Sequence, residues 1–399
     1  MNGVDPYLLG AEVAGPQCDI SLAELDRDPH PLLARARERS PACWVPELGG
    51  WLVTGYDAAV AVLTDPATFT VDDPRFTTAR VTGPSMLSRD GAEHTRHRAP
   101  FAHAFRRAEF TARLGEVTAA EAGRLAEAIR PDGQAELRET VAGPVAASVM
   151  AEALGLAGAR VSPASVLAWY RDIVAAVAAL PAARDQEHQV PVASFGVLAD
   201  GLRAAMAAGK APLLADAARV GTLDDGEVIS NAAVVLFGGI ETTEGMICNV
   251  LLHVLGHPDV PGLRGPFGLI GADVVEESLR LEPAAAIVDR YATRDVDLGA
   301  ARIRQGDLVT VSIAGANRDP AVFDSPDRFD PRRPNVGRHL AFARGPHFCI
   351  GAQLARLEAV TAVNTLLARL PSLRLDDSRP AEIRGLVFRK PRTLHATWP

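Results

Sequence analysis

The sequence predicts a mainly α-helical fold with small β-sheets, and three observations support this fold class. From Glu93 to Gly209 the chain is alanine-rich and helical in pattern, with breaks near prolines. A later apolar segment runs to Gly256 and is stopped by Pro258, which predicts a helix of roughly 50 Å. Strand-like runs are short and no linker divides the chain, so residues 1–399 are expected to form a single domain.

The individual elements follow from local patterns. Pro31–Arg39 is typical of a short helix, Cys43–Val45 and Trp51–Thr54 predict a hairpin, and Tyr56–Leu63 predicts another helix. Phe69–Leu87 contains prolines and has no clear period, so it is predicted to be a long functional loop. A capping box is predicted at Thr222–Asp225. Helices are expected at 272–281 and 351–369, and short strands at 286–288, 301–303 and 308–313. The segment 317–338 is expected to be irregular.

Composition and charge exclude several classes of protein. The chain has 41 Lys and Arg against 49 Asp and Glu and only 5% aromatic residues, which argues against nucleic-acid binding. Its four cysteines form no CxxC pair, so a zinc ribbon or an iron–sulfur ligand set is unsupported. No signal peptide and no uninterrupted apolar run of about 18 residues is present. These features predict a soluble, cytoplasmic protein whose N-terminal extension, residues 1–20, carries no membrane anchor.

Cys349 is the first candidate for chemistry. It stands directly before a predicted helix, where backbone N–H groups and the helix dipole stabilise a thiolate. Gly345 and Gly351 allow the backbone to fold tightly around the sulfur and to approach a flat ligand. Such a thiolate is a metal ligand or a nucleophile, whereas a lone cysteine is most often a small buried hydrophobe.

The residues around this cysteine carry a specific pattern. The segment F-A-R-G-P-H-F-C-I-G resembles the heme-binding loop of the cytochrome P450 family, F-x-x-G-x-H-x-C-x-G, at every fixed position. The resemblance runs from about Trp51 to the C-terminus and is to short, soluble bacterial members. It implies the cytochrome P450 fold, with a long central helix (the family's I helix) over heme b, iron protoporphyrin IX. The loop residues that it assigns to cofactor binding are Phe342, Gly345, His347, Gly351 and Cys349, with Cys349 as the metal ligand.

A second motif lies in the long apolar helix. The run Gly238-Gly239-Ile240-Glu241-Thr242 resembles the family's oxygen-binding stretch. Two glycines inside a core helix cost roughly 1 kcal/mol each relative to alanine, which a closely approaching heme and its O2 would explain. Glu241 and Thr242 are predicted to be catalytic, as an acid and an alcohol that deliver protons. The alternative is that Thr242 bonds to the carbonyl four residues earlier while Glu241 lies on a solvated face.

Heme carries two propionates that need cationic or hydrogen-bonding partners. Arg and His side chains form charge-assisted bonds with carboxylates. By motif position the candidates are His94, Arg98, Arg290 and His347, although each alone is more often a solvated charge. Pro100 is expected to kink or break the helix that carries Arg98.

Three further residues are predicted to have a structural role. Glu277 and Arg280 match the family's E-x-x-R pair and lie three residues apart on one helix face. Arg328 lies in the element that completes a triad in the family, so the resemblance implies a buried triad that supports the cysteine loop. The loop departs from many bacterial relatives at Ala343-Arg344, where they often carry Gly-His.

The resemblance implies monooxygenation of a lipophilic small molecule by O2. Electrons are expected to come from NAD(P)H through ferredoxin reductase and ferredoxin. The enzyme is expected to be a monomer. Peroxide-driven chemistry, ring coupling, desaturation and a non-catalytic partner-binding role remain alternatives, as does a heme-free protein with a nucleophilic Cys349. The segments expected to line the pocket are 69–87, 234–237, 284–288 and 386–388.

One stretch carries an unusual charge pattern for an acidic protein. From His94 to Arg107 there is no acidic residue, and Arg344 and Arg356 are expected on the same side of the molecule. We expect this basic patch to steer an acidic ferredoxin to the side nearest the thiolate. The alternative is a solvated helix face with no partner.

Overall fold

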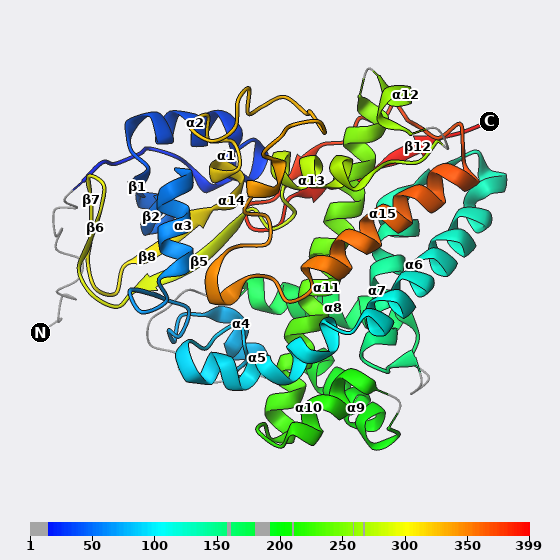
Figure 1. Ribbon diagram of the computed structural model, residues 1–399, viewed down its shortest axis with the longest axis horizontal. Helices are drawn as coiled ribbons and strands as arrows, with labels where there is room; N and C mark the ends of the chain where they lie inside the picture. Colours follow the sequence, from blue (N-terminus) through cyan, green and yellow to red (C-terminus); the bar gives the residue numbers. More distant parts are fainter. Residues whose placement is uncertain (1–14, 158–160, 180–191, 210, 258, 266–267) are drawn as a thin grey trace, which may run out of the picture.

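The structure, a computed structural model, describes the whole chain except residues 1–14, 158–160, 180–191, 210, 258 and 266–267. It is mainly helical with small sheets, which confirms the predicted fold class. Figure 1 shows the largest sheet on one side and the long helices on the other, with the central helix α11 (Asp225–Gly256) between them.

The largest sheet gathers strands from both ends of the sequence. The predicted hairpin is confirmed: β1 (Ala42–Val45) pairs antiparallel with β2 (Gly50–Val53). The sheet continues in the order β1-β2-β8-β5-β3, where β2 and β8 run parallel. The remaining strands of this sheet are β8 (Leu308–Ser312), β5 (Ile287–Ala292) and β3 (Phe69–Thr70). Two smaller sheets have two strands each: β6 (Val296–Leu298) pairs with β7 (Ala301–Ile303), and β10 (Ile383–Arg384) pairs with β11 (Lys390–Pro391). In a third small sheet, β12 (His395–Thr397) pairs with both β4 (Gln134–Glu136) and β9 (Arg374–Leu375).

The helices form the rest of the described fold. Near the sheet they are α1 (Leu22–Arg27), α2 (His30–Arg39), α3 (Tyr56–Thr64), α4 (Thr77–Thr82) and α14 (Ile313–Ala316). The helical side contains α5 (Gly91–Phe105), α6 (Ala108–Ile129), α7 (Gly143–Ala153), α8 (Pro163–Ala179), α9 (Ala193–Ala207), α10 (Pro212–Val220), α12 (Val260–Leu263), α13 (Ala272–Leu281) and α15 (Ala352–Arg369). Short 3-10 turns are η2 (Pro46–Leu48), η3 (Arg130–Asp132), η6 (Val336–Arg338) and η7 (Gly345–His347), and η4 (Arg138–Ala142) is a π-helix.

Helix α11 passes through the core as predicted, but its cap differs from the prediction. The capping box uses Asp224 and Glu227 rather than Thr222 and Asp225, because the Asp224 side chain accepts from the Glu227 N–H. The helix is long and apolar enough to cross a membrane, yet 67% of its most apolar window is buried inside the protein. Burial of this kind is typical of the core helix of a globular domain.

Two predictions about the N-terminal half are wrong in detail. The segment 69–87 is not a continuous loop, because it contains β3 and α4. Of the two effects expected of Pro100, a kink or a break, the break is wrong, since α5 continues through Pro100 to Phe105. Phe101 and Ala104, which follow the proline, are buried, and their packing offsets the hydrogen bond that Pro100 cannot donate.

The described end of the predicted N-terminal extension belongs to the core. Cys18 and Ile20 are buried, and the Cys18 N–H donates to the carbonyl of Trp44 in β1. Residues 1–14 of that extension lie outside the described part of the chain.

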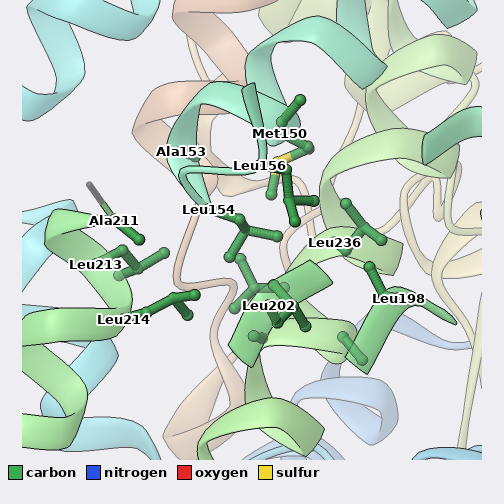
Figure 2. Packing of buried hydrophobic residues seen from close by; sticks show 14 of the residues in the cluster. Met150, Ala153, Leu154, Leu156, Leu198, Leu202, Ala211, Leu213, Leu214 and Leu236 are labelled. Atoms are coloured by element: carbon green, nitrogen blue, oxygen red, sulfur yellow. The ribbon is translucent and has the colours of Figure 1, made fainter. Parts of the chain in front are cut away.

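A hydrophobic cluster fixes α11 against its neighbours. Figure 2 shows Leu236 of α11 facing Leu198 and Leu202 of α9, with Met150 of α7 above them. Met150 is 2% exposed and Leu236 is fully buried. This packing holds the face of α11 that is turned away from the exposed Gly238.

Candidate functional site

The main chain determines the position of Cys349. Its N–H donates to the carbonyl of Phe342 at 2.9 Å, which closes the loop in front of α15. Burial raises the pKa of the Cys349 thiol, while the Gly351 N–H and the cations of Arg98 and Arg356 act in the opposite direction. A metal cation on the sulfur would act in the same direction as these groups and oppose the effect of burial, so it would favour the thiolate.

Backbone geometry in the same loop explains one of its glycines. Gly345 has φ 72°, and a Cβ there would lie 2.5 Å from the carbonyl oxygen of Leu63 at the end of α3. Gly345 is therefore needed for the contact with α3. A Cβ on Gly351 would come no nearer than 3.9 Å to Phe105, so this contact would be an ordinary one. Ala343 also has a positive φ, 58°, which an L-residue adopts with strain.

The middle of α11 is open where the rest of the helix is buried. Gly238 is exposed, and a Cβ on it would meet no atom within 4 Å. Gly239 has a different role, because a Cβ on it would lie 2.1 Å from the sulfur of Met150. The predicted pair of ligand-facing glycines is thus corrected: Gly238 opens a space, and Gly239 allows α7 to pack.

Both members of the predicted acid–alcohol pair have partners in this structure. Thr242 Oγ1 donates to the Gly238 carbonyl at 2.5 Å, which is the alternative considered from the sequence. Glu241 does not lie on a solvated face: it accepts a short hydrogen bond from the Tyr170 hydroxyl and pairs with Lys390 Nζ at 2.7 Å. Tyr170 and Lys390 were missed by the sequence reasoning, because no local pattern connects α8 and β11 to this helix.

The structure brings two of the predicted propionate partners, His94 and His347, together. The rings of His94 and His347 lie 4.4 Å apart. Burial, with His347 and Arg98 nearby, lowers the pKa of His94 to about 4, so this ring is neutral. His347 Nε2 lies 2.8 Å from an oxygen of Asp90. Although burial opposes the change, hydrogen bonds from His347 and Thr70 lower the pKa of Asp90 to about 2.

These residues fit heme b. The buried Nε2 of His94 has no hydrogen-bond partner in the described part of the structure. Arg98 Nη2 donates to the Phe348 carbonyl and Arg290 Nη1 to the Asp289 carbonyl, and among the described residues neither guanidinium pairs with a carboxylate. Donors without acid partners are what two propionates require. These donors suit the two propionates, Cys349 suits the iron, and the open space at Gly238 leaves room beside one face of the heme.

The predicted triad contains a different arginine. Glu277 and Arg280 are fully buried and bonded at 2.7 Å, as expected. Arg328 is exposed, and only its backbone carbonyl takes part, accepting from Arg280. Arg333 replaces it, because its Nε lies 3.4 Å from Glu277 and its side chain is 6% exposed. The triad therefore ties α13 to the irregular segment that leads into the cysteine loop.

The segments expected to line a pocket divide into core and accessible parts. Phe69 is buried in the core beside the large sheet, so it does not line an open space. Phe237 packs against Tyr170, with ring centroids 6.0 Å apart. Val387 and Phe388 are 43% and 37% exposed and supply accessible apolar surface.

The basic stretch is largely neutralised by acids from other elements. Arg96 pairs with Glu93 and Glu227, and Arg107 with Asp216 at 3.4 Å. His97 is buried beside Asn231, and Arg356 pairs with Glu276. The predicted cations for which the described residues offer no carboxylate are Arg98, His103, Arg106 and Arg344.

Comparisons with known proteins agree with this geometry. A sequence model described as "Cytochrome P450" matches residues 272–395. The chain is 36% identical over 397 residues to "Cytochrome P450 monooxygenase PikC" of Streptomyces venezuelae, covering 94% of this chain and 92% of that protein. It is 34% identical over 393 residues to "Nocardicin C N-oxygenase" of Nocardia uniformis subsp. tsuyamanensis, covering 93% and 96%. Among solved structures, that of CalO2 is similar with a TM-score of 0.83 and 29% identity, covering 96% and 99%.

Proposed function

Because this chain belongs to the cytochrome P450 family and is a monooxygenase of that family, we propose that it inserts one oxygen atom from O2 into a lipophilic small molecule. The overall reaction is RH + O2 + 2e⁻ + 2H⁺ → ROH + H2O, with a heteroatom as an equivalent site of oxidation. Electrons come from NAD(P)H through a ferredoxin reductase and a ferredoxin, to a monomeric cytoplasmic enzyme.

One observation carries this proposal: Cys349 directly precedes α15 in a protein that also has the buried, unpartnered His94 Nε2 and an open position at Gly238 of α11. Heme held by a thiolate supplies the oxygen-activating chemistry, because the thiolate's electron density favours O–O cleavage. Phe342 and Gly345 position Cys349 through the main chain. His94, Arg98 and Arg290 would hold the propionates, and His347 would order the same region through Asp90.

Protons are delivered from the α11 side. Thr242 presents a hydroxyl beside the open position at Gly238, and Glu241 supplies the adjacent acid. Accessible Val387 and Phe388 favour an apolar substrate. The similarity to an N-oxygenase favours nitrogen oxidation as the second candidate outcome. Mass spectrometry of products from a substrate deuterated at carbon distinguishes the two, since N-oxidation keeps every deuterium whereas hydroxylation at a labelled carbon loses one.

The identity of the metal ligand is tested by spectroscopy. The dithionite-reduced CO complex should show the strongly red-shifted Soret band of a thiolate ligand. Cys349→Ala should abolish that band, whereas Cys248→Ala, which changes a buried thiol elsewhere in the core, should keep it. A thiolate-type band that persists in Cys349→Ala would refute the ligand assignment.

The role of Thr242 is tested by coupling. Thr242→Ala should keep heme and substrate binding but release peroxide in place of product, so reduced cofactor is still consumed. Glu241→Gln should slow turnover with less peroxide. Unchanged coupling in Thr242→Ala would show that this hydroxyl takes no part in proton delivery.

The redox partner is tested by charge. Arg106 and Arg344 have no acid partner among the described residues, so Arg106→Glu and Arg344→Glu should weaken ferredoxin-driven reduction. Arg107→Glu should weaken it less, because Asp216 already neutralises Arg107. Added salt should slow reduction of the parent protein, since the Debye length falls from about 10 Å at 0.1 M to about 3 Å at 1 M. A rate unaffected by salt and by all three reversals would place the docking surface elsewhere.

A further inference from the structure

The acid of the site is part of a buried chain of charges that reaches the surface. Glu241 Oε1 lies 2.7 Å from Lys390 Nζ, and the same ammonium lies 3.0 Å from Glu244 Oε1. Glu244 in turn accepts from Arg138 Nε at 2.7 Å. Arg138 is near Glu139, whose side chain is 60% exposed. Lys390 is therefore shared between two carboxylates, one at the open part of α11 and one deeper in the core.

The buried part of this chain, formed by Glu241, Lys390, Glu244 and Arg138, is balanced in charge. Glu241 and Glu244 are one helical turn apart on α11, so two carboxylates at this spacing repel each other without a cation between them. Lys390 and Arg138 supply two positive charges for the two acids. Side-chain exposures of 15% for Lys390 and 3% for Glu244 mean that water screens the pairs weakly.

The Tyr170 hydroxyl holds the other oxygen of Glu241. It donates to Oε2, while its ring packs on Phe237. Burial, together with the neighbouring carboxylate, raises the pKa of Tyr170, so the phenol remains a donor. With Oε1 on Lys390 and Oε2 on Tyr170, both carboxylate oxygens of Glu241 are occupied, and neither bonds to Thr242.

From these contacts we propose that Lys390 is a positioning residue that controls when Glu241 is available to move a proton. The ammonium holds Glu241 with Tyr170 in the arrangement seen here, and Glu244 offers it a second anionic partner. When Lys390 stays with Glu244 alone, Glu241 is free to turn towards Thr242. This inference rests on the proposed function, because the proton it controls is one of the two that oxygen insertion consumes.

Two substitutions in the same cluster should act in opposite directions. Lys390→Met removes the cation that holds Glu241, so the proton-dependent step should speed up and its solvent isotope effect (the rate in H2O over that in D2O) should fall. Glu244→Gln removes the competing carboxylate, so Lys390 pairs with Glu241 alone and the isotope effect should rise. We expect each change to be about twofold or more. Tyr170→Phe should change the isotope effect in the same direction as Lys390→Met. Lys390→Arg, which keeps the positive charge, should retain the parent value.

The matched control lies on the neighbouring strand. Arg384 stands opposite Lys390 in the β10–β11 pair and bonds to the exposed Glu382, outside the chain of charges. Arg384→Met should leave the isotope effect unchanged. Turnover with hydrogen peroxide, which brings its own protons, should be the same in all of these variants if the pocket is undisturbed.

A measurement independent of activity separates this inference from the proposed function. In thermal unfolding, Glu241→Gln and Lys390→Met should be non-additive, so the double variant loses less in Tm than the two single losses combined. If the parent protein lacked the thiolate–CO band, the proposed function would fail while this coupling still held. Additive losses in Tm, or isotope effects that move in the same direction in Lys390→Met and Glu244→Gln, would overturn the proposal.

Discussion

The two sides of the site are built in different ways. On the Cys349 side the main chain fixes the geometry, through the bond to the Phe342 carbonyl and the positive φ values of Ala343 and Gly345. On the α11 side the geometry depends on charged side chains, because Glu241 is held by Lys390 and Tyr170. The comparison indicates that backbone geometry sets the position of Cys349, whereas the position of the Glu241 carboxylate depends on its side-chain partners.

The largest expected effect tests what holds the cysteine side. Arg280→Ala should lower the free energy of unfolding by about 3–5 kcal/mol, because it leaves Glu277 buried with a weaker partner. Arg333→Ala should cost more than Arg328→Ala, which should stay within about 0.5 kcal/mol, as is usual for an exposed side chain. Urea unfolding of the three variants measures this. An equal loss in the free energy of unfolding for Arg328→Ala and Arg333→Ala would show that Arg328 contributes to the triad after all.

A second substitution tests whether the backbone determines the geometry of the cysteine loop. Gly345→Ala places a Cβ 2.5 Å from the Leu63 carbonyl oxygen, so the loop or α3 must shift. Strain and overpacking should together cost about 2–4 kcal/mol and broaden the thiolate–CO band. Gly351→Ala is the matched control, because its Cβ has 3.9 Å of room. Similar losses in both variants would show that the clash with α3 is not the cause.

The glycine pair of α11 provides the corresponding test on the other side. Gly239→Ala should destabilise the protein by about 1–3 kcal/mol, because its Cβ would overlap Met150. Gly238→Ala should instead stabilise the helix by up to about 1 kcal/mol while weakening ligand entry to the open space. Thermal unfolding and substrate titration measure both. Equal destabilisation would mean that Gly238 is also packed, contrary to the open position described here.

The smallest effect concerns the residue that departs from many relatives. Ala343 has φ 58°, so Ala343→Gly should relieve strain and stabilise the protein by about 1 kcal/mol. The spectrum of the CO complex should not change, because the backbone path stays the same. Loss of stability in Ala343→Gly would show that the loop depends on the Ala343 methyl group rather than tolerating it.

The sequence was sufficient for the parts of the site that depend on short segments. The cysteine loop, the acid–alcohol pair and the Glu277–Arg280 pair each lie within a few residues of chain, and the structure places them on the predicted elements. The limits of α13 and the course of α11 were also predicted, since hydrophobic periodicity and helix-stop residues act locally. The cap of α11 was misplaced by two residues, because both Thr222–Asp225 and Asp224–Glu227 have the spacing of a capping box.

Tertiary structure decided the contacts between distant segments. Tyr170 and Lys390 reach Glu241 from α8 and β11, and Glu227 and Asp216 neutralise arginines of the basic stretch. The choice of Arg333 over Arg328 was also settled there, because an irregular segment has no period that indicates which side chain turns inward. By itself the sequence determined that Cys349 precedes a helix and that α11 is long and apolar, since both follow from local sequence patterns. Which charges meet, and so which acids are restrained, is a property of packed surfaces that no local pattern encodes.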